Sequence, residues 1–280
     1  MSSEPAAPSA EPAASAPPPN PQDAAALPAT AVIEPATVPE PIEAVVWDID
    51  DTLFDYAGAD LAGLRAHLGA EGLLDLHGST EAALAEWQRL TRIHWARCES
   101  GEVDFLTQRR DRVREFLTSS LDDDGIDAWF AGYAVHYEAA WALFPDVLPA
   151  LEALSGRYRH AVLSNSALST QEYKLATLGL RDRFEAVLCA VDLGVSKPEP
   201  GAFHAVGEAL GLAPARIAYV GDQPDTDARG ARDAGMLGIW LDRTNSPSAT
   251  PSGVHRITSL AELEALLGTH TRFGAPSTFG

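Results

Sequence analysis

The chain has 280 residues, of which 46% are hydrophobic, and its 40 acidic and 20 basic side chains give a formal net charge of −20. This length allows a hydrophobic core of ordinary size, in one large domain or two modest ones. The charge argues against a nucleic-acid partner, because phosphate backbones are bound by clustered lysines and arginines.

The N-terminal segment, residues 1–43, is rich in Pro, Ala, Ser and Glu, and the first basic residue of the chain is Arg65. Such a segment cannot bury enough apolar surface to offset its ordering entropy, so we predict a disordered tail. It has neither the positive region nor the continuous apolar region of a secretory signal, and no later run approaches the roughly 18 apolar residues of a membrane span. Cys98 and Cys189 fit no ligand spacing and are expected to be reduced thiols. A cytoplasmic protein with no membrane partner is therefore expected.

The first predicted element is a strand at 44–47, whose apolar and β-branched residues are typical of a buried strand. It is followed by three carboxylates in four positions, those of Asp48, Asp50 and Asp51. Burying so much negative charge is costly unless a cation or a proton compensates it. The sequence therefore predicts a functional site at the end of this strand.

The next segment, residues 57–144, has apolar side chains at helical spacing with glycines between the runs, which predicts an insert of four or five helices. Five of its residues, and the residue just before it, carry side chains suited to substrate contact, although packing or solvent exposure explains each of them better. The candidates are Tyr56, Arg65, His94, Trp95, Arg109 and His136.

From residue 145 onward, short apolar runs alternate with amphipathic segments, the pattern of a parallel α/β sheet. Together with 44–56, residues 145–267 are predicted to form the α/β core domain, and 268–280 a flexible tail. The predicted strands are 160–163, 186–191, 217–220 and 238–241, and the predicted helices are 146–154, 171–178, 200–210, 226–234 and 260–267.

Polar residues follow the predicted strands, and the carboxyl ends of parallel strands share one edge of a sheet, where such folds bind ligands. Lys197 lies just after one of these strands, with prolines on its C-terminal side that restrict the backbone. Ser164 and Asn165 are candidates for donating hydrogen bonds to a phosphate group, but both residue types are also typical helix caps. The strand-end residues expected to converge are Asp48, Ser164, Asp192 and Asp222.

The chemistry of these side chains points to a metal and to phosphoryl transfer. Hard carboxylate oxygens, as in Asp48, Asp222 and Asp227, suit magnesium better than zinc, for which the chain has no His/Cys cluster. A carboxylate such as Asp48 can act as a nucleophile in phosphoryl transfer. Magnesium and Lys197 would supply the positive charge that the phosphoryl oxygens need.

Four stretches, in this order, resemble the motifs of the haloacid dehalogenase-like hydrolase superfamily. They are 48–53 (Asp-Ile-Asp-Asp-Thr-Leu), Ser164 at a strand end, Lys197 followed by Pro198, and Gly221-Asp222 with Asp227 five residues later. The resemblance extends over residues 44–267. It implies a doubly wound, Rossmann-like parallel sheet with an inserted α-helical cap domain at 57–144.

The resemblance also implies catalytic roles. Asp48 would attack phosphorus, and Asp50 would protonate the leaving oxygen and then activate water. Thr52 and Ser164 would bind phosphoryl oxygens, and Lys197 would steady both the nucleophile and the phosphate. Magnesium would be held by Asp48, the main-chain carbonyl of Asp50 and Asp222, with support from Asp227.

The implied activity is magnesium-dependent hydrolysis of a small phosphorylated metabolite through an aspartyl-phosphate, that is, a phosphatase. A phosphomutase of the same superfamily keeps all four motifs and stays open as an alternative. A 2-haloacid dehalogenase is disfavoured because that subgroup characteristically lacks the acid found here as Asp50, and a non-catalytic binding module is disfavoured because no motif is degenerate.

Overall fold

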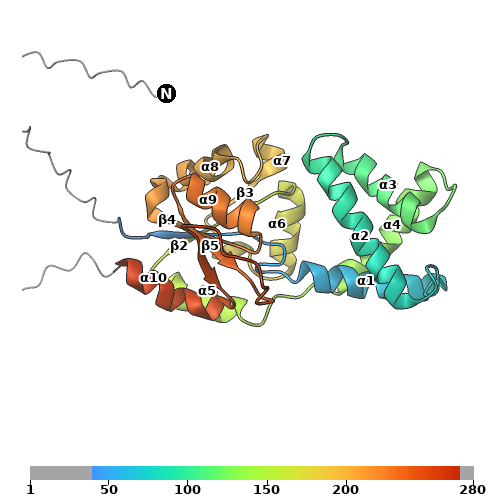
Figure 1. The fold of residues 1–280 in the computed structure, drawn as a ribbon, viewed down its shortest axis with the longest axis horizontal. Coiled ribbons are helices and arrows are strands. Elements are labelled where there is room, and N and C mark those ends of the chain that lie inside the picture. Colours follow the sequence, from blue (N-terminus) through green and yellow to red (C-terminus); the bar gives the residue numbers. More distant parts are fainter. Residues whose placement is uncertain (1–39, 272–280) are drawn as a thin grey trace, which may run out of the picture. The chain divides into compact units, whose positions relative to one another are not determined.

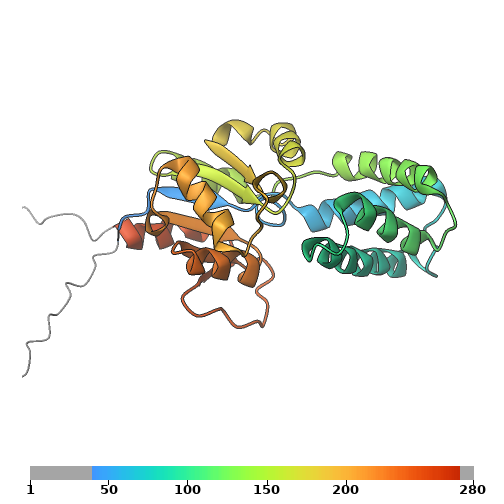
Figure 2. The same ribbon diagram turned by 90° about the horizontal axis from the view of Figure 1, so that it is seen from above.

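The computed structural model describes residues 40–271, so the predictions for 1–39 and 272–280 lie outside the described residues. Within that range the chain forms a parallel sheet in the order β3-β2-β1-β4-β5-β6, flanked by helices (Figures 1 and 2). The α/β fold with a doubly wound sheet and a helical insert is therefore confirmed. The strands are β1 (Ala44–Trp47), β2 (Arg159–Ser164), β3 (Ala186–Cys189), β4 (Ile217–Gly221), β5 (Leu237–Leu241) and β6 (His255–Ile257).

Successive side chains of β1 point to opposite faces of the sheet and enter two separate cores. Val45 and Trp47 belong to the core that also contains apolar residues of α5 (Val147–Ser155) and α10 (Leu263–Thr271). Ala44 and Val46 belong to the core formed with α8 (Pro200–Leu210) and α9 (Gly230–Asp233). β1 is completely buried and lies between β2 and β4 in the sheet. Asp48, which follows β1, therefore lies near the middle of the edge formed by the carboxyl ends of the strands.

Several boundaries differ from the sequence predictions, and the largest differences are these. The strand predicted at 186–191 ends at Cys189, because the chain turns into the short helix α7 (Ala190–Leu193). The helix predicted at 226–234 begins as a π-helical segment, η3 (Pro224–Arg229), that leads into α9. The last helix, predicted to end at 267, runs on to Thr271, and the three-residue edge strand β6 was not predicted.

The insert consists of four helices: α1 (Tyr56–Glu71), α2 (Thr80–Glu99), α3 (Phe105–Leu117) and α4 (Asp123–Ala139). They enclose a hydrophobic core of their own. Helices α1 and α4 pack closely because glycines stand at their contact: a Cβ on Gly63 would lie 2.5 Å from Cα of Tyr137, and one on Gly132 would lie 2.7 Å from the His67 ring.

The two connections between this insert and the sheet run side by side. The amide of Asp55 donates to the Ala142 carbonyl (3.0 Å), and that of Phe144 donates to the Leu53 carbonyl (3.2 Å). The Asp55 carboxylate also accepts from the amide of Gly58 and caps α1. None of the helices within residues 40–271 is both long and apolar enough to cross a membrane.

Candidate active site

Asp48, the first residue after β1, is almost fully buried, and both of its carboxylate oxygens have partners. Its amide donates to the Val220 carbonyl at 2.9 Å, which ties the residue to β4. Oδ1 accepts from Nζ of Lys197 at 2.7 Å, and Oδ2 accepts from the Thr52 hydroxyl at 3.3 Å. Thr52 is completely buried, so its hydroxyl is held beside the carboxylate.

Lys197 is the buried counter-charge of this edge. Besides Asp48, its Nζ contacts Oδ1 of Asp227 at 2.7 Å and the Tyr219 hydroxyl at 2.9 Å. Burial by itself would lower the pKa of Lys197, but attraction to Asp227 and Asp48 outweighs it and raises the pKa well above its ordinary value. The Asn165 side chain binds the main chain of Lys197. It accepts a hydrogen bond from the Lys197 amide at 2.8 Å and donates one to the Lys197 carbonyl at 2.9 Å. Asn165, predicted as a phosphate contact, is therefore engaged in fixing the position of Lys197.

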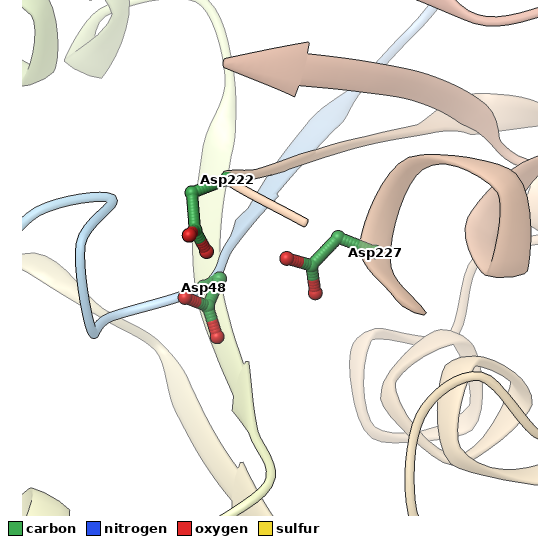
Figure 3. A group of neighbouring side chains, drawn as sticks. All are labelled: Asp48, Asp222 and Asp227. Atoms are coloured by element: carbon green, nitrogen blue, oxygen red, sulfur yellow. The ribbon is translucent and has the colours of Figure 1, made fainter. Parts of the chain in front are cut away.

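Three carboxylates meet beside this lysine (Figure 3). Asp48, Asp222 and Asp227 each offer an oxygen, and these atoms lie within 4.8 Å of one another. Burial raises the pKa of Asp48 to about 7, with Lys197 opposing the rise and Asp227 adding to it. Burial, then repulsion from Asp227 and Asp48, raises the pKa of Asp222 well above its ordinary value. Lys197 contacts two of the three carboxylates, so the cluster has a net negative charge when all three are ionised.

The position of Asp227 depends on the absence of a side chain at Gly221. A Cβ there would lie 2.4 Å from the Asp227 carboxylate. Oδ2 of Asp227 accepts from the amide of Gln223 at 3.0 Å, while Oδ1 is taken by Lys197. The side chain of Asp222 is bound more loosely, by the Gln223 amide group at 2.8 Å.

Asp50 lies beside this cluster but its side chain has other partners. The ammonium of Lys174 forms an ion pair with Oδ1, and the Gln171 amide donates to Oδ2 at 2.8 Å and to the Ser164 hydroxyl at 3.1 Å. Lys174 and Gln171 belong to α6 (Leu168–Thr177), and both are buried. Neither was predicted as a site residue, although two polar residues three apart on the buried face of a helix are a signal for one.

The Lys174 ammonium also lies among aromatic rings. Its Nζ is 4.3 Å from the centre of the Phe54 ring and about 6 Å from those of Tyr56 and Trp141. Contacts of this kind favour a charged ammonium where water is excluded. The aromatic rings therefore help to hold the Lys174 ammonium in place, and through it the ion pair with Asp50.

A cavity of about 880 Å³ opens next to Asp50. Of the insert candidates, Tyr56, Trp95 and Arg109 line it. The other three lie elsewhere: Arg65 is near Glu81, His94 contacts Glu115, and the His136 ring packs on His67.

Residues 42–235 match the haloacid dehalogenase-like hydrolase family, which is more than half of the chain. The chain belongs to this family. The glyceraldehyde 3-phosphate phosphatase of Methanopyrus kandleri is 31% identical over 210 residues, covering 72% of this chain and 84% of that protein. Further phosphatases align over 81% of this chain at 25–35% identity.

A dehalogenase also occurs among the relatives. The (S)-2-haloacid dehalogenase of Xanthobacter autotrophicus is 31% identical over 198 residues, covering 70% of this chain and 73% of that protein. Among solved structures, the magnesium-bound HAD-hydrolase YfnB of Bacillus subtilis has a TM-score of 0.69 at 20% identity, covering 81% of this chain and 99% of that one. That likeness supports the fold of this haloacid dehalogenase-like hydrolase.

Proposed function

We propose that this hydrolase is a magnesium-dependent phosphatase that cleaves small phosphomonoesters through an aspartyl-phosphate on Asp48. The observation that carries the proposal is the pairing of a nucleophile and a proton carrier two residues apart. Asp48 is held by Lys197, and Asp50 is held by Lys174 beside the open cavity. Phosphatase relatives of comparable length support this class of reaction.

The donor set fits a divalent cation. Asp48 and Asp222 supply hard oxygen ligands close together, in a cluster whose three acids face one lysine. Both oxygens of Asp227 already accept hydrogen bonds, so Asp227 would mainly hold Lys197 in place and support the site. When bound, magnesium would compensate the surplus negative charge and that of the phosphoryl group.

In the proposed reaction, a carboxylate oxygen of Asp48 forms a bond to phosphorus while the bond from phosphorus to the leaving oxygen breaks. Asp50, which must first have taken up a proton, gives it to that oxygen, and the alcohol departs. Asp50 then takes a proton from water as the water oxygen attacks phosphorus and the bond from phosphorus to the Asp48 oxygen breaks, which releases inorganic phosphate and restores the Asp48 carboxylate. Thr52 and Ser164, both buried, would donate to phosphoryl oxygens.

The dehalogenase alternative rests on a relative of equal identity, but this chain carries acids that displacement of halide from carbon does not require. Asp50, together with the cluster of Asp48, Asp222 and Asp227, matches phosphoryl transfer. Removal of magnesium by a chelator should abolish the phosphatase activity but leave a dehalogenase activity unchanged, and this difference provides the test.

Removal of magnesium is expected to abolish turnover, because the acid cluster would lack its counter-charge. Phosphate release from p-nitrophenyl phosphate should fall to background in EDTA and return with excess MgCl₂. Magnesium at 100 times its dissociation constant should also raise the free energy of unfolding by about 2.7 kcal/mol, since only the folded chain assembles the site. Asp222→Asn should lose both responses. Phosphate release that persists in EDTA, or halide release from 2-haloacids in EDTA, would refute the proposal.

Lys174 is proposed to position Asp50 rather than to touch substrate. Lys174→Met should lower kcat on alkyl phosphates by about 10- to 100-fold with little change in KM, because general acid–base catalysis contributes about 10²- to 10⁴-fold and a less well positioned Asp50 would keep part of it. In kcat/KM, which covers only the steps through formation of the aspartyl-phosphate, the loss should be much smaller on p-nitrophenyl phosphate, whose leaving group departs without a proton. A purely structural role would instead lower the rates on both esters equally, so the ratio of the two rates decides the matter.

A further inference from the structure

The cavity beside Asp50 is bordered by α2, α3 and α4 of the insert and by the loops after β2 and β3. If the proposed function is correct, the leaving group of the ester must occupy it, because Asp50 is the proton carrier and lies on its wall. A volume of about 880 Å³ is in the upper range for pockets that bind drug-sized ligands. An alcohol of two or three carbons would fill little of it.

We propose that the preferred substrates are phosphomonoesters of a neutral alcohol that carries a planar aromatic ring with a hydrogen-bonding edge. This inference rests on the proposed function and adds the substrate class. Three features of the cavity wall support it: its aromatic side chains, its paired cations and its unpartnered polar atoms.

Aromatic side chains from three helices face the cavity. Trp95 of α2 and Phe105 of α3 lie with ring centres 5.8 Å apart, and Phe130 and Tyr133 of α4 lie 5.3 Å apart. Rings in such tilted arrangements present both faces and edges to a ligand. A planar ring gains from these quadrupolar contacts beyond the burial of its area, and a saturated ring does not.

The positive charges of the wall are already compensated. Within the described residues three basic side chains line the cavity, and each acts on a carboxylate. Lys174 pairs with Asp50, and Arg109 lies 3.1 Å from a carboxylate oxygen of Asp127. The remaining one, Arg112, donates to the Thr91 hydroxyl at 3.2 Å and lies over the Trp87 ring, 4.4 Å from its centre. Its charge also acts on the buried carboxylate of Asp60, which accepts from Tyr133 and Trp87. This balance disfavours leaving groups that carry an additional negative charge.

Two buried polar side chains of α3 have unpartnered atoms. Gln108 is 1% exposed and its Oε1 has no hydrogen-bond partner, and Arg112 is 5% exposed and its Nε has none. Both line the cavity, and four residues apart on a helix they share one face. Buried polar atoms are normally hydrogen-bonded, so a ligand that offers a donor to Gln108 and an acceptor to Arg112 would complete this wall.

The ring preference is tested with two primary-alcohol esters of similar size, benzyl phosphate and cyclohexylmethyl phosphate. With magnesium present, kcat/KM should be about 3- to 10-fold higher for the aromatic ester. Glycerol 3-phosphate, too small to reach the aromatic wall, should be poorer than either. Equal values for the two rings, or a preference for glycerol 3-phosphate, would overturn the proposal.

The preference for a ring with a hydrogen-bonding edge is tested with uridine 5′-monophosphate, whose base carries a hydrogen-bond donor beside a hydrogen-bond acceptor. Gln108→Leu should lower kcat/KM for this ester about 10-fold, mainly through KM, and leave benzyl phosphate within about twofold. Gln88→Leu, the same change on α2 at a residue that does not line the cavity, should leave both esters unchanged. An equal loss on both esters in Gln108→Leu would contradict the assignment.

Binding separates this inference from the proposed function. Calorimetric titration of the Asp48→Asn variant with the same esters should show the same order of affinities without turnover. If no ester is hydrolysed by the wild type but the order of affinities holds, the proposed reaction fails and the pocket assignment stands. If turnover is normal but neither rates nor affinities favour the aromatic ring, the pocket assignment alone fails.

Discussion

Asp48→Asn is expected to reduce phosphatase turnover by at least about 10³-fold, because an amide cannot form the aspartyl-phosphate. Asparagine has nearly the same volume as aspartate, and its side-chain oxygen can still accept from Lys197. The fold should therefore survive. Phosphate release with p-nitrophenyl phosphate and saturating magnesium measures the effect, and thermal unfolding of the same samples verifies that the variant is folded.

The matched control for this substitution is Asp225→Asn. Asp225 lies on the same sheet edge, in the π-helical segment η3, but its side chain is exposed and pairs with Arg229. This variant should keep turnover within about twofold of the wild type. If Asp48→Asn retained more than a few per cent of the activity, the covalent route would be wrong, and a water attacking directly would have to replace it.

The centre of the site could be predicted from the sequence because of a general property of parallel sheets. Asp48 and Asp222 directly follow β1 and β4, which are neighbours in the sheet, so their convergence follows from the strand pattern alone. Lys197 was also predicted to reach this edge, and its Nζ does contact Asp48, although α7 separates Lys197 from the end of β3. For Asp48 and Asp222, a short apolar run that ends in a polar residue is enough to predict a place at the carboxyl end of a strand.

The surroundings of Asp50 could not be predicted in this way, because they depend on how a helix packs over the sheet edge. Lys174 and Gln171 reach Asp50 across more than 120 positions of sequence. Nor does any local pattern reveal that the Asn165 side chain binds the main chain of Lys197, since an asparagine that does so and one that contacts a phosphate use the same amide.

The cavity wall was only partly predicted, for a related reason. Tyr56, Trp95 and Arg109 were named as candidates from residue type, and they line it. Gln108 and Arg112 were not, because residues of this type usually lie at the surface. Their burial arises from the packing of α3 on α2 and α4, which amphipathic spacing alone does not fix.

Lys197→Met is expected to abolish turnover and also to destabilise the fold, a combination that Asp48→Asn should not produce. The change leaves Asp48 and Asp227, 6% and 1% exposed, without their shared cation. Removing one partner of a buried ion pair costs roughly 3–5 kcal/mol, because the remaining charge stays in a poorly solvated place. Urea unfolding in EDTA, where no metal can replace the lysine, measures this cost.

The double variant Lys197→Met/Asp227→Asn decides whether uncompensated charge is the cause. It removes one positive and one negative charge from the same contact, so it should recover at least about 1 kcal/mol of the lost stability, while turnover stays absent. Asp225→Asn in place of Asp227→Asn should recover nothing, because that carboxylate is exposed and does not contact Lys197. A double variant no more stable than Lys197→Met would mean that lost packing around the lysine stem, and not the charge of Asp227, accounts for the destabilisation. Since the Lys197 contacts with Asp48 and Asp227 are also what would orient the nucleophile, the same charge balance that stabilises this edge of the sheet would prepare it for phosphoryl transfer.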